Sequence, residues 1–174
     1  MSKQSVFLVG LMAVGKSTVG RLLAQQLGYQ FYDTDHVIEE RAGADVAWIF
    51  DVEGEEGFRD RETQVIDELT RLEHVVVATG GGAVLRECNR RMLASRGCVV
   101  HLDSPLERLL ERTHKDRKRP LLQKGDPQET LALLQAERDP LYREVADYRF
   151  VTDRHSPKAL VRAIASRLEE DGVA

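Results

Sequence analysis

The stretch Val6-Phe7-Leu8-Val9-Gly10-Leu11-Met12-Ala13-Val14-Gly15-Lys16-Ser17-Thr18 decides the fold of this chain. It is a short apolar run, then a loop, then the start of a helical pattern, and residues 10–17 match the phosphate-binding loop G-x-x-x-x-G-K-[ST]. In such a loop, backbone N–H groups surround phosphate oxygens, and the helix N-terminus that follows adds partial positive charge. Lys16 can reach the outer phosphates, and Ser17 can offer its hydroxyl to Mg²⁺. The alternative is a glycine-containing turn without a ligand, but the apolar run before the loop and the periodicity after it favour the phosphate site.

Length and composition restrict the class of protein. A chain of 174 residues with 31% charged and 42% hydrophobic residues is typical of one globular domain. No apolar run approaches membrane-spanning length, and residues 1–5 leave no room for a signal peptide before the first strand. Cys88 and Cys98 lack metal-ligand spacing and indicate free thiols in a reducing cytoplasm. The net charge of −4 argues against general nucleic-acid binding. We expect a cytoplasmic monomer without membrane or nucleic-acid partners.

Apolar runs and capping signals predict alternating strands and helices. The expected strands are residues 6–9, 30–32, 75–79, 98–102 and 148–152. Gly28 should end the first helix. A capping residue precedes a proline at four places, which predicts helices beginning near residues 105, 127, 140 and 157. This alternation indicates a parallel α/β sheet.

Two short motifs follow predicted strands, where ligands of parallel α/β sheets lie. Asp33 and Asp35 can share one side of an extended segment, close to the phosphate loop. Such a pair can instead be a helix N-cap and a solvated acid, but the upstream phosphate loop favours a site. Gly80, Gly81 and Gly82 follow the third strand. Because three consecutive glycines cost backbone entropy, they indicate a backbone that approaches a ligand closely.

Two segments differ from the rest of the chain. Gly43 and Asp45 separate two short helical patterns, and Gly54 and Gly57 flank an acidic turn, which predicts a small helical insertion. Residues 113–125 form a long basic connection, which we interpret as a mobile lid rather than a solvated basic loop. The histidines have no partner spacing and indicate no histidine-based metal site; they are His36, His74, His101, His114 and His155.

Six motifs in fixed order carry a family resemblance. They are G-x-M-x-x-G-K-S-T, D-T-D, F-R-x-x-E, T-G-G-G, R-P-L-L and E-R-x-P-L-Y, at residues 10–18, 33–35, 58–62, 79–82, 119–122 and 137–142. The phosphate loop alone is shared with very many proteins, whereas the ordered set, which covers nearly the whole chain, resembles the shikimate kinase family. The resemblance implies an α/β, nucleoside-monophosphate-kinase-like P-loop fold of three layers with a five-stranded parallel sheet. It implies one kinase domain, residues 1–174, with a core of 1–33, 62–112 and 126–174, a substrate-binding insertion of 34–61 and a mobile lid of 113–125.

The resemblance also implies a reaction and its residues. The reaction is transfer of the ATP γ-phosphate to the 3-hydroxyl of shikimate, in aromatic amino-acid biosynthesis. The implied catalytic residues are Asp35 at the reacting hydroxyl, with Lys16 and Arg119 at the phosphates. The implied shikimate-binding residues are Asp35, Arg59, Gly80, Gly81, Gly82 and Arg138. The implied ATP-binding residues are Ala13, Val14, Gly15, Lys16, Ser17, Thr18, Arg112, Arg119 and Arg154, with Arg112 and Arg154 beside adenine. Ser17 and Asp33 would hold Mg²⁺.

The chemical requirements of phosphoryl transfer agree with these implied roles. Phosphoryl transfer needs positioning and charge neutralisation, and guanidinium groups match the carboxylate of an acid substrate. Two alternatives remain: another small-molecule kinase of this fold, acting on gluconate or a nucleoside monophosphate, and a nucleotide-dependent binding module. The module would need the phosphate loop but not Asp35 or Arg138. Ala13 stands where similar members often carry glycine, and we expect it to be unstrained because the outer glycines are intact.

Overall fold

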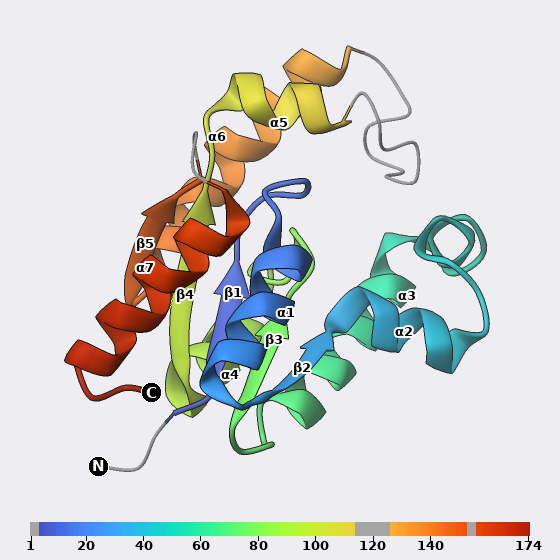
Figure 1. Ribbon diagram of the computed structural model, residues 1–174. Helices are drawn as coiled ribbons and strands as arrows, with labels where there is room; N and C mark the ends of the chain where they lie inside the picture. Colours follow the sequence, from blue (N-terminus) through green and yellow to red (C-terminus); the bar gives the residue numbers. More distant parts are fainter. Residues whose placement is uncertain (1–3, 114–125, 153–155) are drawn as a thin grey trace.

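Five parallel strands form one sheet in the order β2-β3-β1-β4-β5 (Figure 1). The computed structural model describes residues 4–113, 126–152 and 156–174. The strands are β1 (Val6–Val9), β2 (Gln30–Asp33), β3 (Val75–Ala78), β4 (Cys98–Asp103) and β5 (Tyr148–Val151). Each predicted strand is therefore confirmed to within a residue or so, and the five-stranded parallel sheet is confirmed.

Burial along the strands explains their sequences. The central strands β1 and β3 are buried at every position, and both are continuous apolar runs. The edge strands β2 and β5 are partly exposed and carry polar residues among the apolar ones. Strand β1 pairs with β3 and β4, so the loop that leaves it begins at the middle of the sheet's carboxyl edge.

Helices cover both faces of the sheet and complete the three layers. They are α1 (Lys16–Leu27), α2 (Thr34–Ala42), α3 (Val46–Leu69), α4 (Glu87–Arg96), α5 (Leu106–Thr113), α6 (Pro127–Val145) and α7 (Pro157–Glu170). Helices α1 and α7 lie side by side in front of the sheet in Figure 1. Helix α4 lies behind it and contacts α3 and α6. None of the helices in the described part of the chain is long and apolar enough to cross a membrane.

Most predicted helix ends are confirmed. Gly28 and Gly43 end α1 and α2 in the left-handed conformation, with φ of 72° and 67°. Asp45, Asp126 and Ser156 are N-caps whose side chains accept hydrogen bonds from the first turns of α3, α6 and α7. Local chemistry alone therefore sets these boundaries.

Two predicted boundaries were wrong. No helix begins at Pro140, which lies inside α6. A proline removes one backbone hydrogen bond, and the buried side chains of Tyr142 and Val145 hold the helix against the core beyond it. Only Gly54 interrupts α3, with φ 76° and ψ 176°, whereas Gly57 lies within the helix.

The predicted insertion, residues 34–61, corresponds to α2 and the first part of α3, which lie beyond the β2 edge of the sheet (Figure 1). Of the predicted lid, 113–125, only Thr113 is described, as the last residue of α5. Arg119 lies outside the described residues, as does Arg154.

Candidate functional site

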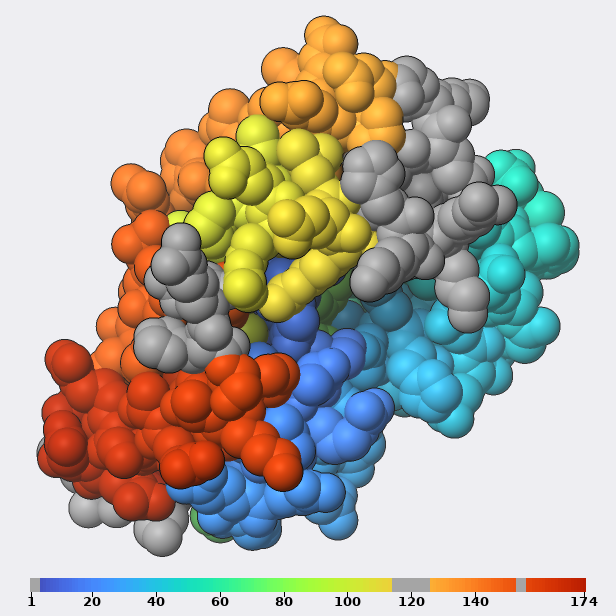
Figure 2. All heavy atoms as spheres, turned by 45° about the horizontal axis from the view of Figure 1, so that its top comes forward, coloured from blue at the N-terminus to red at the C-terminus, as the bar shows by residue number. Residues whose placement is uncertain are grey.

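The phosphate loop lines a cavity of about 380 Å³ at the carboxyl edge of the sheet. Figure 2 shows the start of α1 beside a recess bordered by α5 and α7. The lining includes all six predicted nucleotide-contacting loop residues, Ala13, Val14, Gly15, Lys16, Ser17 and Thr18. It also includes Asp33, Asp35, Gly80 and Gly81 from the neighbouring strand ends, together with Arg112. The structure thus places the phosphate loop, the predicted metal pair and Asp35 around one cavity, whereas Arg59, Gly82 and Arg138 are not among its lining residues.

Lys16 is held against the backbone of its own loop. Its ammonium donates to the carbonyl oxygens of Gly10 and Leu11, at 2.5 and 2.8 Å, and the side chain is buried. Arg112, at the end of α5, donates from Nη1 to the carbonyl oxygens of Ala13 and Val14, at 3.1 and 2.9 Å. Two cationic side chains therefore border the loop whose N–H groups form the predicted phosphate site.

Ala13 does not meet the expectation of an unstrained residue. Its φ is 66°, in the left-handed region, so the expectation from the sequence was wrong. The intact outer glycines do not remove this requirement: Gly10 and Gly15, with φ of 151° and 101°, serve two other turns of the loop. This chain therefore places a strained alanine where glycine would fit freely.

Asp33 has one of the two roles that the sequence left open, that of a helix N-cap, and it also contacts the phosphate loop. It is the N-cap of α2: its Oδ1 accepts from the N–H groups of Asp35 and His36, at 3.0 and 3.3 Å. Its Oδ2 accepts a short hydrogen bond from the Ser17 hydroxyl. The cap thus fixes a carboxylate against the phosphate-loop hydroxyl, and these two oxygen donors are of the type that Mg²⁺ prefers.

The three glycines after β3 each lie against a different predicted substrate residue. A Cβ atom added to Gly80 would lie 2.8 Å from Asp35 Oδ1, and one added to Gly81 would lie 3.2 Å from Arg138 Nη1. A Cβ atom on Gly82 would lie 2.6 Å from Arg59 Cζ. The glycines are therefore required because side chains from three helices converge on this backbone.

Arg59 and Glu62 form a buried ion pair beneath the glycines. Arg59 Nη1 donates to Glu62 Oε1 at 2.9 Å, and the two side chains are 8% and 0% exposed. Burial raises the pKa of Glu62, the positive charges of Arg59 and Arg138 oppose that rise, and the negative charge of Asp35 adds to it. Arg138 is 3% exposed, and its Nε has no hydrogen-bond partner among the described residues. Two arginines and two carboxylates thus meet at one buried point.

Sequence reasoning did not assign roles to three residues at this point. Glu62 pairs with Arg59, and the Tyr142 hydroxyl donates to the carbonyl oxygen of Gly81 at 2.5 Å. Thr34 also holds the glycine backbone, because its hydroxyl accepts a hydrogen bond from the N–H of Gly80 at 3.1 Å. Glu62 is the last residue of the F-R-x-x-E motif, and Tyr142 is the last residue of E-R-x-P-L-Y. Membership of these motifs was the signal that could have identified both residues.

Comparison with known proteins bears on this arrangement. The sequence model of a family described as shikimate kinase matches residues 12–169. The chain belongs to the shikimate kinase family. A shikimate kinase of Vibrio campbellii is 55% identical over 168 residues, covering 97% of this chain and 98% of the relative. Family members are kinases that use ATP to phosphorylate shikimate in aromatic amino-acid biosynthesis, and this chain is such an enzyme.

Solved structures agree with the family assignment. A shikimate kinase from Acinetobacter baumannii, in complex with shikimate, has a TM-score of 0.96 at 46% identity, covering 99% of this chain and 97% of that one. The shikimate kinase of Aquifex aeolicus has a TM-score of 0.84 at 36% identity, covering 97% and 98%. The fold predicted from the resemblance is therefore confirmed.

Proposed function

We propose that the chain transfers the ATP γ-phosphate to the 3-hydroxyl of shikimate, with Asp35 at that hydroxyl and Arg59 and Arg138 at the carboxylate. One observation carries the proposal: Asp35, Arg138 and Arg59 lie in turn against Gly80, Gly81 and Gly82, next to the phosphate-loop cavity. A small acid resting on the glycine backbone would meet an acid at one end and guanidinium groups at the other. Guanidinium groups match a carboxylate in geometry and charge.

The two arginines would contribute differently. Arg59 already shares its charge with Glu62, and its guanidinium carbon lies 5.3 Å from the Phe58 ring centroid, so packing fixes its position. Arg138 is buried on α6 and makes no ion pair among the described residues, so its charge is the less compensated one. Arg138 is therefore the better single target for testing carboxylate recognition.

ATP would bind with its phosphates in the loop formed by residues 13–18, and Arg112 would border the nucleotide. Arg119 and Arg154 are assigned to ATP by the family resemblance alone. Ser17 and Asp33 fit Mg²⁺, because both offer oxygen atoms that already contact each other beside the loop. Bound Mg²⁺ would neutralise charge that develops on the phosphates.

In the transfer step, the 3-hydroxyl oxygen attacks the γ-phosphorus while the bond to the β-phosphate oxygen breaks, so that ADP leaves. Asp35 orients the hydroxyl and accepts its proton late in the step. Lys16 stabilises negative charge on the outer phosphates. The chemistry therefore requires no covalent enzyme intermediate.

We also propose that the chain consists of the core, insertion and lid given above. It would act as a monomer in the cytoplasm. The cysteines support the compartment: Cys88 and Cys98 are both free thiols. Gel filtration at assay concentration tests the oligomeric state.

The test compares shikimate with its methyl ester in an ADP-release assay. Loss of a charge-assisted contact should cost about 1.5–3 kcal/mol, so Arg138→Ala should lower kcat/KM for shikimate roughly 10- to 150-fold. The ester should be poor with the parent enzyme, and Arg138→Ala should lose little more with it. Arg91→Ala is the control, because Arg91 is an exposed arginine paired with Glu87 on α4.

If Arg138→Ala harmed acid and ester equally, Arg138 would act on the phosphates or the fold instead. Parallel assays with gluconate and nucleoside monophosphates test the acceptor class. Faster ADP release with either than with shikimate would refute the proposed acceptor.

A further inference from the structure

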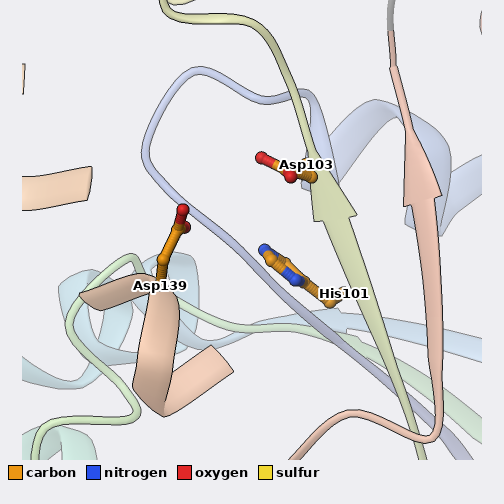
Figure 3. A group of neighbouring side chains, drawn as sticks. All are labelled: His101, Asp103 and Asp139. Atoms are coloured by element: carbon orange, nitrogen blue, oxygen red, sulfur yellow. The ribbon is translucent and has the colours of Figure 1, made fainter. Parts of the chain in front are cut away.

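Three side chains meet behind the phosphate loop, outside the site described above. His101 and Asp103 lie on β4, and Asp139 lies on α6, next to Arg138 in the chain. One ligand-capable atom from each lies within 4.8 Å of the other two. Figure 3 shows the His101 ring directed toward the space between the two carboxylates. Nothing in the proposed kinase mechanism uses this group.

His101 is a buried imidazole with an unused nitrogen. The residue is 2% exposed, and its Nδ1 has no hydrogen-bond partner among the described residues. The ring packs against Tyr142, with centroids 5.0 Å apart. Burial lowers the pKa of His101 to about 4, so the ring is neutral near pH 7 and keeps a lone pair for a ligand. An unpartnered buried nitrogen is costly and therefore calls for an explanation.

The two carboxylates differ in charge compensation, because Asp103 is ion-paired with Arg149 and Asp139 is not paired among the described residues. Asp103 Oδ2 accepts from Arg149 Nη2 at 2.5 Å, and its Oδ1 accepts from the Ser104 N–H at 2.9 Å. Asp139 makes no ion pair or hydrogen bond through its carboxylate in the described part of the chain. Burial raises the pKa of Asp139, and the charge of Asp103 adds to the rise, against Arg143 and Arg149. A cation between the carboxylates would relieve their repulsion.

We propose that His101, Asp103 and Asp139 bind one divalent transition-metal ion of the Zn²⁺ type, with water completing the coordination. The donor set decides the class of ion. One imidazole nitrogen with two carboxylate oxygens suits Zn²⁺, Co²⁺ or Ni²⁺, whereas Mg²⁺ and Ca²⁺ prefer oxygen ligands throughout. The site is thus chemically distinct from the Ser17 and Asp33 pair. Arg149, Arg143 and Lys16 all lie near enough to influence His101, so we expect moderate affinity rather than that of a closed structural zinc site.

The test is a calorimetric Zn²⁺ titration of the full chain without nucleotide, because ATP itself binds Zn²⁺. Two surface features would add background binding, the exposed Cys88 thiol and the His36–Glu40 pair at 3.1 Å. Titrations are therefore made in a Cys88→Ser, His36→Gln background. We expect one Zn²⁺ per chain, unaffected by an excess of Mg²⁺.

The decisive variant is Asp139→Asn, which keeps the side-chain volume. It should weaken Zn²⁺ binding at least about tenfold, since even indirect partners of metal ligands have effects of that size. Glu137→Gln is the matched control, an exposed acid two residues away on α6, and it should bind as the background does. Unfolding temperatures of both variants establish that they fold.

A second measurement follows the ligand directly: the imidazole NMR signals of His101, assigned with His101→Gln, should shift on Zn²⁺ addition. Equal Zn²⁺ binding by Asp139→Asn and Glu137→Gln would overturn the proposal. So would the absence of Zn²⁺ binding by the background protein, or unmoved His101 signals at saturation.

Discussion

Replacing Ala13 by glycine should stabilise this protein, although alanine-to-glycine changes normally destabilise. Ala13 has a φ of 66°, and the left-handed region costs an L-residue roughly 1–2 kcal/mol. Glycine adopts that φ freely but gains about 0.4–1 kcal/mol of entropy in the unfolded chain. The difference between the midpoints of these ranges is a net gain of about 0.8 kcal/mol, or an unfolding temperature higher by roughly 2–3 °C for a chain of this size.

The control is Ala94→Gly, at an exposed position of α4. Glycine in a helix interior costs about 0.5–1 kcal/mol, so this variant should unfold at a lower temperature than the parent. Both variants are compared with the parent by thermal and urea unfolding without nucleotide. Opposite signs are expected. If Ala13→Gly lowered the unfolding temperature as much as Ala94→Gly, the loop alanine would not be strained and the reasoning would fail.

Three further outcomes are expected. Asp33→Asn should regain part of its ADP-release activity as Mg²⁺ is raised, and Asp35→Asn should not; equal rescue of both would contradict their separate roles. Tyr142→Phe leaves a buried carbonyl without its donor, so urea unfolding should show a loss of about 1–3 kcal/mol, and the KM for shikimate should rise more than kcat falls. Burial raises the pKa of Cys98 to about 12, so alkylation of the native protein at pH 8 should label only Cys88, as one mass adduct, and urea should expose the second thiol.

The raised pKa of Cys98 also determines the direction in which stability changes with pH. The unfolded thiol ionises near pH 9, whereas the folded one keeps its proton to about pH 12. Above pH 9 the native state therefore binds more protons than the unfolded state, and stability falls as pH rises from 9 toward 12. Below pH 9 both states hold the proton, and Cys98 contributes no pH dependence.

The elements that sequence analysis predicted correctly are those that local chemistry determines. Gly28 ends α1 because only a left-handed residue fits there, and Asp45 begins α3 because its carboxylate caps the helix. The helix start predicted at Pro140 was wrong, because a capping residue before a proline also occurs inside a long helix that tertiary packing stabilises beyond the proline. Local signals cannot distinguish these two cases.

The candidate site and the separate His101 group divide in the same way. Spacing along the chain predicted the phosphate loop and the Asp33–Asp35 pair, because their members are neighbours in sequence. The His101 group was missed because β4 and α6 bring its members together across 38 positions of the chain, so no spacing rule applies. Contacts between distant segments depend on packing, which the residue pattern of either segment alone does not contain.

The three glycines show how a local signal can carry non-local information. A loop needs one or two glycines, and the third is explained only by what surrounds it: Asp35 from α2, Arg138 from α6 and Arg59 from α3 occupy the space where three Cβ atoms would lie. Any alanine here must therefore displace one particular side chain. Gly82→Ala would press on Arg59, which the Glu62 pair and Phe58 hold in place. Gly81→Ala would place its Cβ 3.2 Å from Arg138 Nη1, a milder but still tight contact. The order of the three glycines thus follows the order of the functional groups across the proposed substrate. The loss of folding stability on each glycine-to-alanine change should depend on how firmly the neighbouring side chain is held.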